Sequence, residues 1–427
     1  MSRAISRSDF DLLIIGGGMV GACLAAAAAH DRELARLRIA LLDASPPTQP
    51  PPDSDIDLRV SAVSRASQHI LESFGAWPLI PSAYRSPYSE MVVWDAGGKA
   101  FGPGSIHFSA SETSEPNLGH IVENRRLQWS IYTSPAFTNG VTLLRATLAG
   151  LEFQDEMATA LLGDGRRVTA SLIVGADGAS SASRKLAGIE SRGFSYEQHA
   201  FVTHVRTEHP HRQTAWQRFQ PQGPIAFLPL ADGRSSIVWT TKPEHAQALV
   251  NGDAAAAGIE MAAALDQVLG SVTIDGPRAS FPLALAHAKQ YCRPRFVLIG
   301  DAAHAVHPLA GQGVNLGFLD CAALVETLSN ELAASGDAAS LSELRVLRRY
   351  ERWRKSENVL ALGLIDGLNR LFSNSNDALG WLRRTGLGLV NGNRVAKRAL
   401  IGRAMGIAGE VPQLAAAPRF PRSHQTR

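Results

Sequence analysis

The chain has 427 residues, of which 45% are hydrophobic, and this is enough to bury a substantial core and to form two interleaved domains. A formal net charge of +3 gives no indication of nucleic acid as a partner, whereas a pI near 8.8 permits contact with anionic lipid. The absence of a Cys-x-x-Cys motif argues against a redox-active dithiol and favours reduced thiols in the cytoplasm for the three cysteines, Cys23, Cys292 and Cys321.

The first predicted element is a βα unit. A buried strand at residues 12–15 is followed by a glycine loop and by an alanine-rich helix at residues 22–29. A second strand, residues 38–42, ends in Asp43, near where an acid should bind an adenosine ribose. The loop contains the three glycines of a dinucleotide fingerprint, which provide a tight turn, close approach to a pyrophosphate and close helix packing: Gly16, Gly18 and Gly21.

An alternative interpretation of the same stretch is a membrane span or a signal peptide, because residues 12–29 are all apolar or glycine. The three central glycines, the acidic Asp11 and the fingerprint spacing favour a buried βα unit. No other segment approaches the length of a membrane span. The sequence therefore predicts a soluble, cytoplasmic protein.

The next chemical motif follows a proline-rich loop, residues 46–57, and lies near the middle of the chain. A strand leads into Asp177-Gly178, and Ser181 and Arg184 follow at offsets of four and seven. This pattern places a hydroxyl and a guanidinium on one side of a turn, where they could orient a flavin and an incoming nicotinamide. A β-turn with a capping serine is the alternative.

From residue 194 to residue 282 the pattern changes to alternating strands, which predicts an antiparallel sheet half covered by the cofactor domain. We assign this sheet to the substrate. Although aromatic residues in strands usually belong to the core, four residues are candidates for an aromatic wall beside the substrate: Trp216, Phe227, Pro229 and Trp239.

A third motif begins where the strand at 296–299 ends in Gly300-Asp301. Asp301 is an acceptor suited to ribose or ribityl hydroxyls. Backbone N–H groups at a helix start near Val314 would stabilise the negative charge of a reduced flavin. That loop and helix start comprise Gly311, Gln312, Gly313, Val314 and Asn315. His304 and His307 are interpreted as loop-shaping residues, and no metal site is predicted.

Beyond residue 340 the chain is predicted to be largely helical, and it carries two groups of basic residues. These groups indicate either a solvated helix face or a membrane-facing surface. The first group is Arg345, Arg348, Arg349, Arg352, Arg354 and Lys355, and the second is Arg383, Arg384, Arg394, Lys397, Arg398 and Arg403.

The three motifs together resemble those of the class A flavoprotein aromatic monooxygenases. Residues 307–320, His-Pro-Leu-Ala-Gly-Gln-Gly-Val-Asn-Leu-Gly-Phe-Leu-Asp, are similar to the segment that marks ubiquinone-biosynthesis hydroxylases of the UbiH, UbiF and VisC type. Further stretches resemble the same family, so that the similarity covers nearly the whole chain: residues 58–62, 93–95, 118–124, 226–230, 369–373, 384–387 and 404–406.

The resemblance implies an α/β fold: a Rossmann-like FAD-binding domain of the p-hydroxybenzoate hydroxylase type, interleaved with an antiparallel-sheet substrate domain, plus a helical C-terminal region. The implied FAD-binding parts are residues 1–83, 118–190 and 285–340. The implied substrate-domain parts are 84–117 and 191–284, and the C-terminal region is 341–427. It also implies that Arg59, Arg125 or Gln128, and Pro308 contribute to the cofactor site.

The implied reaction is hydroxylation of a polyprenyl phenol or quinol by O2 through a flavin C4a-hydroperoxide, with NADPH or NADH as co-substrate. The resemblance further allows a homo-oligomer, contact with other ubiquinone-biosynthesis proteins and peripheral attachment to the inner face of the cytoplasmic membrane. No single catalytic base is indicated. Two other functions stay open, a flavin-dependent reductase and a non-catalytic lipid-binding subunit.

Short stretches of sequence indicate which ring carbon is hydroxylated. Residues 58–62, 93–95 and 404–406 look closest to the VisC-like C5 hydroxylases, whereas residues 214–219 look more like the C6 enzymes of the UbiF type. We expect hydroxylation at C5, with C6 or C1 as alternatives.

Overall fold

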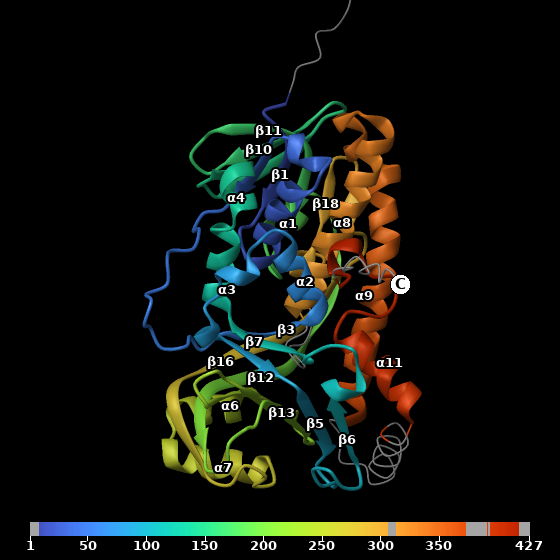
Figure 1. Cartoon of the computed structure of the whole chain (residues 1–427). Helices are drawn as coiled ribbons and strands as arrows, with labels where there is room; N and C mark the ends of the chain where they lie inside the picture. Colours follow the sequence, from blue (N-terminus) through green and yellow to red (C-terminus); the bar gives the residue numbers. More distant parts are fainter. Residues whose placement is uncertain (1–7, 306–312, 373–390, 392, 418–427) are drawn as a thin grey trace, which may run out of the picture.

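The computed structural model describes residues 8–305, 313–372, 391 and 393–417. These residues form two eight-stranded sheets and one three-stranded sheet, which lie one after another along the molecule (Figure 1). The upper sheet in this view has long helices beside it, and the lower sheet has two short ones. The predicted α/β class, with a Rossmann-like part and a largely antiparallel part, is confirmed.

The Rossmann-like half is built around β1, which pairs in parallel with β2 and with β11. β8 and β18 extend the parallel arrangement, whereas β17, β9 and β10 pair antiparallel at its margins. The strands are β1 (Phe10–Ile15), β2 (Ile39–Leu42), β8 (Val141–Leu144), β9 (Leu148–Phe153), β10 (Ala158–Leu162), β11 (Arg167–Gly175), β17 (Cys292–Arg293) and β18 (Phe296–Leu298). The continuous burial of β2 is typical of a parallel strand covered on both faces.

Two long helices of this half pack closely because small residues lie between them. Half of α1 (Met19–His30) is alanine, and a Cβ at Gly317 of α8 (Gly313–Ser335) would come within 2.5 Å of Val20 Cγ2. This packing brings the turn before α1 close to the start of α8. The other helices here are α2 (Arg65–Ser73), α3 (Asn124–Tyr132), α4 (Pro135–Gly140), α5 (Ala182–Leu186) and α9 (Leu344–Phe372).

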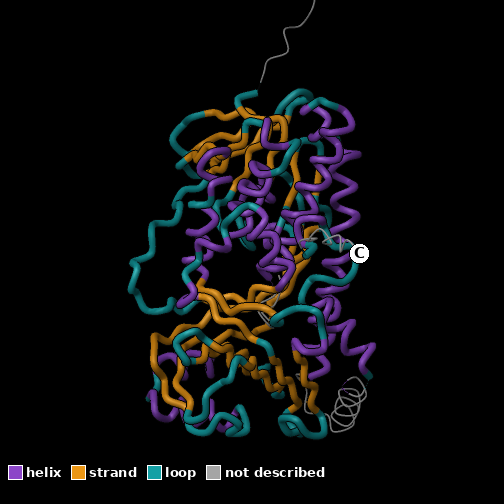
Figure 2. The backbone as a smooth tube through the Cα atoms, viewed as in Figure 1, coloured by secondary structure: helices purple, strands orange, loops and turns teal. Residues whose placement is uncertain are grey.

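The antiparallel half is a sheet with the order β19-β16-β12-β15-β14-β13-β5-β6, in which only the β13–β5 pair is parallel among the described strands. Helices α6 (Pro243–Asn251) and α7 (Ala254–Ala264) pack on one face. The strands are β5 (Glu90–Asp95), β6 (Ser105–Ser109), β12 (Ser191–Thr207), β13 (Thr214–Phe219), β14 (Ile225–Pro229), β15 (Ser235–Thr241), β16 (Val272–Ala288) and β19 (His304–Ala305). The long strands β12 and β16 run from this half toward the other (Figure 2).

A small sheet joins the two halves. Its order is β3 (Val60–Ser64), β7 (Gly119–Glu123), β4 (Arg85–Tyr88). Helix α11 (Arg394–Ala404) packs beside it through Ile401, which shares an apolar cluster with Leu118. Among the helices of the described residues, none is both long enough and apolar enough to cross a membrane.

Candidate flavin site

The glycine loop after β1 is shaped by close backbone contacts. Gly16 has a φ of +102°, and a Cβ there would lie 2.6 Å from Ala176 O. A Cβ at Gly21 would lie 1.9 Å from Gly16 O. Gly18 differs, because no described atom lies within 4 Å of where its Cβ would be, and no described side chain caps α1 there. No described side chain therefore satisfies the first N–H groups of α1, which suits a pyrophosphate.

Side chains from other elements converge on Gly17. Gln128 Nε2 donates to Gly17 O at 2.8 Å, and Tyr132 Oη donates to the same oxygen at 2.9 Å. A Cβ at Gly17 would lie 2.1 Å from Asp43 Oδ2, which is also 3.3 Å from Tyr132 Oη. Burial and the charge of Asp43 raise the pKa of Tyr132, so its hydroxyl stays a donor. Asp43 thus stands at the loop as expected.

Tyr132 and Gly17 were not singled out by sequence. Gly17 could have been found as the middle of three glycines, but Tyr132 reaches the loop from α3, 115 residues further along the chain. Of the two alternatives in α3, only Gln128 contacts the loop. Arg125 instead donates from Nε to Glu123 Oε1 at 2.8 Å and from Nη2 to Ser54 Oγ at 3.2 Å, so it holds the proline-rich loop.

The Asp177-Gly178 turn follows β11. Gly178 has a φ of +80° and no described atom within 4 Å of its Cβ position. The carboxylate of Asp177 accepts hydrogen bonds from Ser181 Oγ at 2.5 Å, from Ser183 Oγ at 2.7 Å and from Ser183 N at 2.8 Å. Asp177 therefore stabilises the turn, and the backbone at Gly178 is the part that faces open space.

Ser181 and Arg184 are both occupied by contacts within the protein. Ser181 is buried and its Oγ accepts from Arg184 N at 2.9 Å, capping α5. Arg184 is also buried, and it donates to Ala302 O at 2.7 Å and to Ala179 O at 3.1 Å. Both side chains join the Asp177 turn to the Gly300–Ala302 turn, and their role in orienting a flavin or nicotinamide stays a prediction.

The Gly300-Asp301 corner follows β18. Gly300 has a φ of +57°, and its N donates to Asp320 Oδ2 at 3.0 Å. Asp301 is exposed to solvent, yet the surrounding protein desolvates it and raises its pKa, as does the charge of Asp320, while His304 and Arg59 act in the opposite direction. An accessible carboxylate beside a basic Arg59 is a suitable acceptor for sugar hydroxyls.

A buried ionic cluster lies behind this corner. Besides Gly300 N, the carboxylate of Asp320 receives Arg354 Nε at 2.8 Å and Asn358 Nδ2 at 3.2 Å, and it lies 2.5 Å from His304 Nε2. Burial opposes ionisation of Asp320, but the charges of His304 and Arg354 outweigh it and lower the pKa. The sequence motif contained Asp320 but did not reveal that α9 supplies its partners.

The start of α8 is held by a side chain rather than left free. Asn315 Oδ1 accepts from Ser64 N at 2.9 Å and from Ser67 Oγ at 2.7 Å, and Asn315 Nδ2 donates to Ala62 O at 2.8 Å. These bonds fix the backbone of Gly313 to Asn315 against β3 and α2. Pro308, Gly311 and Gln312, as well as His307, lie outside the described residues.

The predicted aromatic wall is corrected by the structure. Trp216, Phe227 and Trp239 belong to a buried cluster that includes Leu249 of α6 and Met261 of α7. They therefore pack on the helix-covered face of the sheet. Pro229 is buried two residues beyond Phe227 in β14, so alternation places it on that face too. The physical reason is the ordinary one for strand aromatics, since they fill the core between sheet and helices.

The cofactor motifs meet at one edge of the sheet. β1, β11 and β18 are neighbours in the order β18-β11-β1 and run parallel, so the glycine loop, the Asp177 turn and the Gly300 corner follow the carboxyl ends of three adjacent strands. With open space at Gly18 and Gly178 and acceptors at Asp43 and Asp301, the described residues fit a long dinucleotide such as FAD.

Comparison with known proteins agrees with this geometry. Residues 146–355 match the family described as FAD binding domain. The structure resembles p-nitrophenol 4-monooxygenase PnpA from Pseudomonas putida DLL-E4 with a TM-score of 0.71 and 16% identity over 92% of this chain and 97% of that one, which shows a shared fold. Fold and site together define an FAD-binding protein that shares its fold with PnpA.

Two relatives narrow the class. The chain is 34% identical to 3-demethoxyubiquinol 3-hydroxylase of Escherichia coli (strain K12), over 94% of this chain and all of that one. It is 37% identical to the mitochondrial ubiquinone biosynthesis monooxygenase COQ6 of Rattus norvegicus, over 90% of this chain and 88% of that one. The chain therefore belongs to the family of FAD-dependent hydroxylases of ubiquinone biosynthesis, as the resemblance predicted.

Proposed function

We propose that the protein hydroxylates the aromatic ring of a polyprenyl phenol or quinol, with O2 as oxidant and NADPH or NADH as electron donor. The observation that carries this proposal is the position of the cofactor edge, the sheet edge where β1, β11 and β18 end. It lies across the small β3-β7-β4 sheet from the face of the antiparallel sheet that α6 and α7 leave uncovered (Figure 1). FAD, when bound, supplies electron transfer and oxygen activation. The chain holds the cofactor, presents the ring and excludes water.

Individual residues have distinct proposed roles. Asp43 and Gln128 contribute to the adenosine and pyrophosphate end, because both lie at the Gly17 loop. Asp301 accepts hydrogen bonds from ribityl hydroxyls. The N–H groups at the start of α8, held in place by Asn315, favour negative charge on the flavin ring. Arg59, exposed near Asp301, is proposed as a further cofactor contact.

The prenyl chain is proposed to provide much of the substrate affinity. Burial of one prenyl unit contributes about 4 kcal/mol at roughly 0.8 kcal/mol per carbon. Extraction of a long chain from a bilayer therefore opposes binding strongly, which favours an enzyme that accepts the ring while part of the chain remains elsewhere.

Isotope labelling tests the reaction class. Purified FAD-loaded protein is incubated with NADPH or NADH, a short-chain prenyl phenol and ¹⁸O2, and the product is examined by mass spectrometry. We expect one labelled oxygen atom on the ring. Oxidation of the nicotinamide with a reduced but unlabelled aromatic product would instead identify a flavin-dependent reductase. Protein purified without yellow cofactor that also fails to take it up would support the lipid-binding alternative.

The proposed position of hydroxylation is C5, on the resemblance of residues 58–62, 93–95 and 404–406 to C5 enzymes. The Escherichia coli relative, which is named for a demethoxyubiquinol, makes that compound the second candidate substrate. Expression in bacterial strains that lack one ring hydroxylase at a time distinguishes them. We expect quinone synthesis to return in the C5-deficient strain, and rescue of only the C6- or C1-deficient strain would reject C5.

A peripheral membrane contact is proposed for α11 rather than α9. In α9, Arg345 and Arg349 pair with Glu331 of α8, and Arg354 pairs with Asp320, so its basic group largely stabilises the fold. In α11, Val395 is 80% exposed beside Arg394. Flotation with anionic and zwitterionic vesicles tests this, because Val395→Asp should reduce binding to anionic vesicles, and equal flotation of variant and wild type would exclude this surface.

A further inference from the structure

Phe281 stands apart from the other aromatic residues of the antiparallel sheet. It lies in the middle of β16, yet 41% of it is exposed. Its cross-strand neighbour in β12 is Ala200, and Thr240 of β15 follows in the same row. These short side chains leave the ring uncovered on a surface where large apolar groups are normally buried.

The row that contains Phe281 faces away from α6 and α7. The adjacent row, Ser280, Phe201 and Trp239, points the other way, because Phe201 and Trp239 belong to the cluster packed against those helices. Side chains alternate between the faces of a strand, so Phe281 and Ala200 lie on the opposite face.

That opposite face is turned toward the Rossmann-like half. In β14, Phe227 packs against α6 and α7, whereas its neighbour Leu228 packs with Ile56 and Ala62 of the segment around β3. Because side chains alternate along each strand, Phe281 lies on the same face as Leu228, and this face is turned toward the cofactor edge. Figure 1 shows the same arrangement, with α6 and α7 on the far side of the sheet.

β16 leads directly from Phe281 to the flavin corner. Five residues further on, Ala286 pairs with Ala305 of β19, and His287 pairs with His304, which contacts the Asp320 cluster. Five residues of antiparallel strand span about 17 Å. A substrate whose ring lies at the cofactor would therefore direct its chain, and not its ring, past Phe281.

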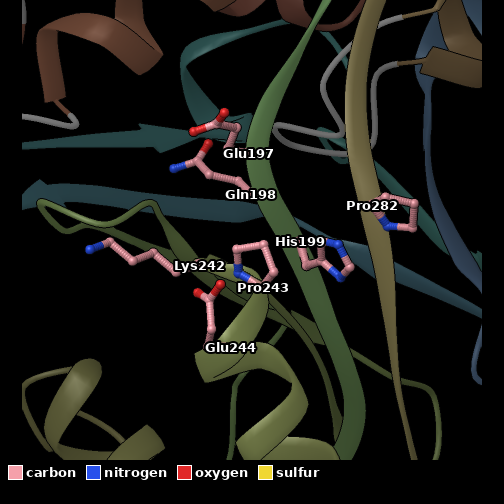
Figure 3. Close-up of a pocket in the computed structure, with 7 residues that line it drawn as sticks. All are labelled: Glu197, Gln198, His199, Lys242, Pro243, Glu244 and Pro282. Carbon is pink, nitrogen blue, oxygen red and sulfur yellow. The ribbon is translucent and has the colours of Figure 1, made fainter.

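A hollow on the opposite side of the same sheet has unsuitable chemistry for a hydrocarbon. A cavity of about 420 Å³ is lined by Glu197, Gln198, His199, Lys242, Pro243, Glu244 and Pro282 (Figure 3). His199 pairs with Pro282, and by alternation both lie on the α6 side of the sheet. Burying an apolar chain against two carboxylates and an ammonium group would desolvate charges without compensation.

We propose that Phe281 is a specificity-determining residue that contacts the prenyl chain of the substrate. This assignment rests on the proposed function, since it names the part of the same site that recognises the hydrocarbon. An accessible aromatic ring surrounded by Ala200, Val202 and Ala279 offers contact to an apolar chain and no hydrogen bond to a polar group.

The test compares two substrates in the wild type and three variants. Phe281→Ala, Phe281→Leu and a control, Ile259→Ala, are prepared as FAD-loaded enzyme. Ile259 is 73% exposed on α7, on the far side of the sheet, so its loss should change nothing. For a geranyl phenol we expect kcat/KM to fall about tenfold in Phe281→Ala, mostly through KM, and to recover in Phe281→Leu. For phenol without a prenyl group we expect less than a twofold change.

Binding of the geranyl phenol, measured by calorimetry, separates this inference from the reaction itself. Weaker binding in Phe281→Ala alone supports the assignment even if the wild type fails to hydroxylate the compound, in which case only the proposed function is lost. Hydroxylation with equal affinity in wild type and Phe281→Ala overturns the assignment and leaves the function intact. Equal losses for both phenols would likewise overturn it. FAD content and thermal stability should match the wild type throughout.

Discussion

The two halves of the molecule build their parts of the site in different ways. In the Rossmann-like half, we propose that backbone does most of the binding, at Gly18 and Gly178, where no described atom lies within 4 Å of the Cβ positions. Side chains hold the neighbouring backbone, since Gln128 bonds to Gly17 and Asp320 bonds to Gly300. In the antiparallel half, the backbone is occupied by sheet pairing and recognition depends on which side chains each face presents. Glycine spacing in the sequence can therefore predict the cofactor site, whereas the substrate site can be predicted only when the orientation of the strands is known.

The strongest test of this contrast exchanges one aromatic residue of the helix-covered face. Phe227→Ala removes a fully buried ring from the core between β14 and α7 and should lower the free energy of unfolding by about 4 kcal/mol. Urea denaturation measures this change. KM for a prenyl phenol should stay near the wild-type value at a temperature where the variant is folded. A raised KM with unchanged stability would instead support the sequence-based prediction that Phe227 contacts the substrate.

Asp320→Asn tests the ionic cluster behind the flavin corner. The substitution keeps the shape but leaves Arg354 and His304 without a buried carboxylate, and it should lower the free energy of unfolding by about 3 kcal/mol and weaken FAD retention. As a control, Arg345→Met breaks ion pairs with Glu331 and Glu343, but this arginine is more than half exposed and Arg349 still pairs with Glu331, so the change should cost less than about 1 kcal/mol. Equal effects of the two variants would contradict the positioning role of Asp320.

Gly18→Ala tests whether open backbone binds the cofactor. Gly18 has a φ of −60° and no described atom within 4 Å of its Cβ position, so the apoprotein should fold normally. The methyl group would enter the space assigned to the pyrophosphate and should weaken FAD binding about 100-fold, or about 2.7 kcal/mol. Gly363→Ala, which also meets no described atom, is the matched control and should leave affinity unchanged. Unchanged affinity in Gly18→Ala would place the pyrophosphate elsewhere.

The small β3-β7-β4 sheet that joins the two halves contains His120, and the protein should become less stable in mild acid. Burial, with the nearby charges of Arg65 and Arg85, lowers the pKa of His120 to about 4, below the ordinary histidine value of 6.5. The unfolded chain therefore takes up this proton first as the pH falls, and the free energy of unfolding drops by about 2 kcal/mol between pH 7.5 and pH 5. His120→Gln should show a smaller drop between pH 7.5 and pH 5 in chemical denaturation. An identical pH dependence in both proteins would refute this assignment.

The sequence predicted the cofactor residues best where they are close together in the chain. Gly16, Gly18, Gly21 and Asp43 occupy one βαβ unit, so spacing alone could place them. Tyr132 and Arg354 reach the same site from distant helices, and no local pattern reports such tertiary contacts. For Ser181 and Arg184, the sequence did not show that both side chains are buried in contacts with neighbouring turns.

The substrate residues were harder to predict for a geometric reason. Alternation in β14 indicates that Phe227 and Pro229 share a face, but a strand pattern does not tell which face α6 and α7 will cover. The large aromatic residues lie on the face that α6 and α7 cover. The open face is marked by small residues around Phe281, a signal that becomes meaningful only when the register with Ala200 is known.

The measurement that tests the central claim most directly is a titration of the apoprotein with FAD, followed by flavin fluorescence. The convergence of the three motifs at one sheet edge predicts saturable binding of one FAD per chain, strongly weakened by Gly18→Ala and unaffected by Gly363→Ala. Absence of saturable binding, or binding that is indifferent to Gly18, would contradict the assignment of that edge as the cofactor site.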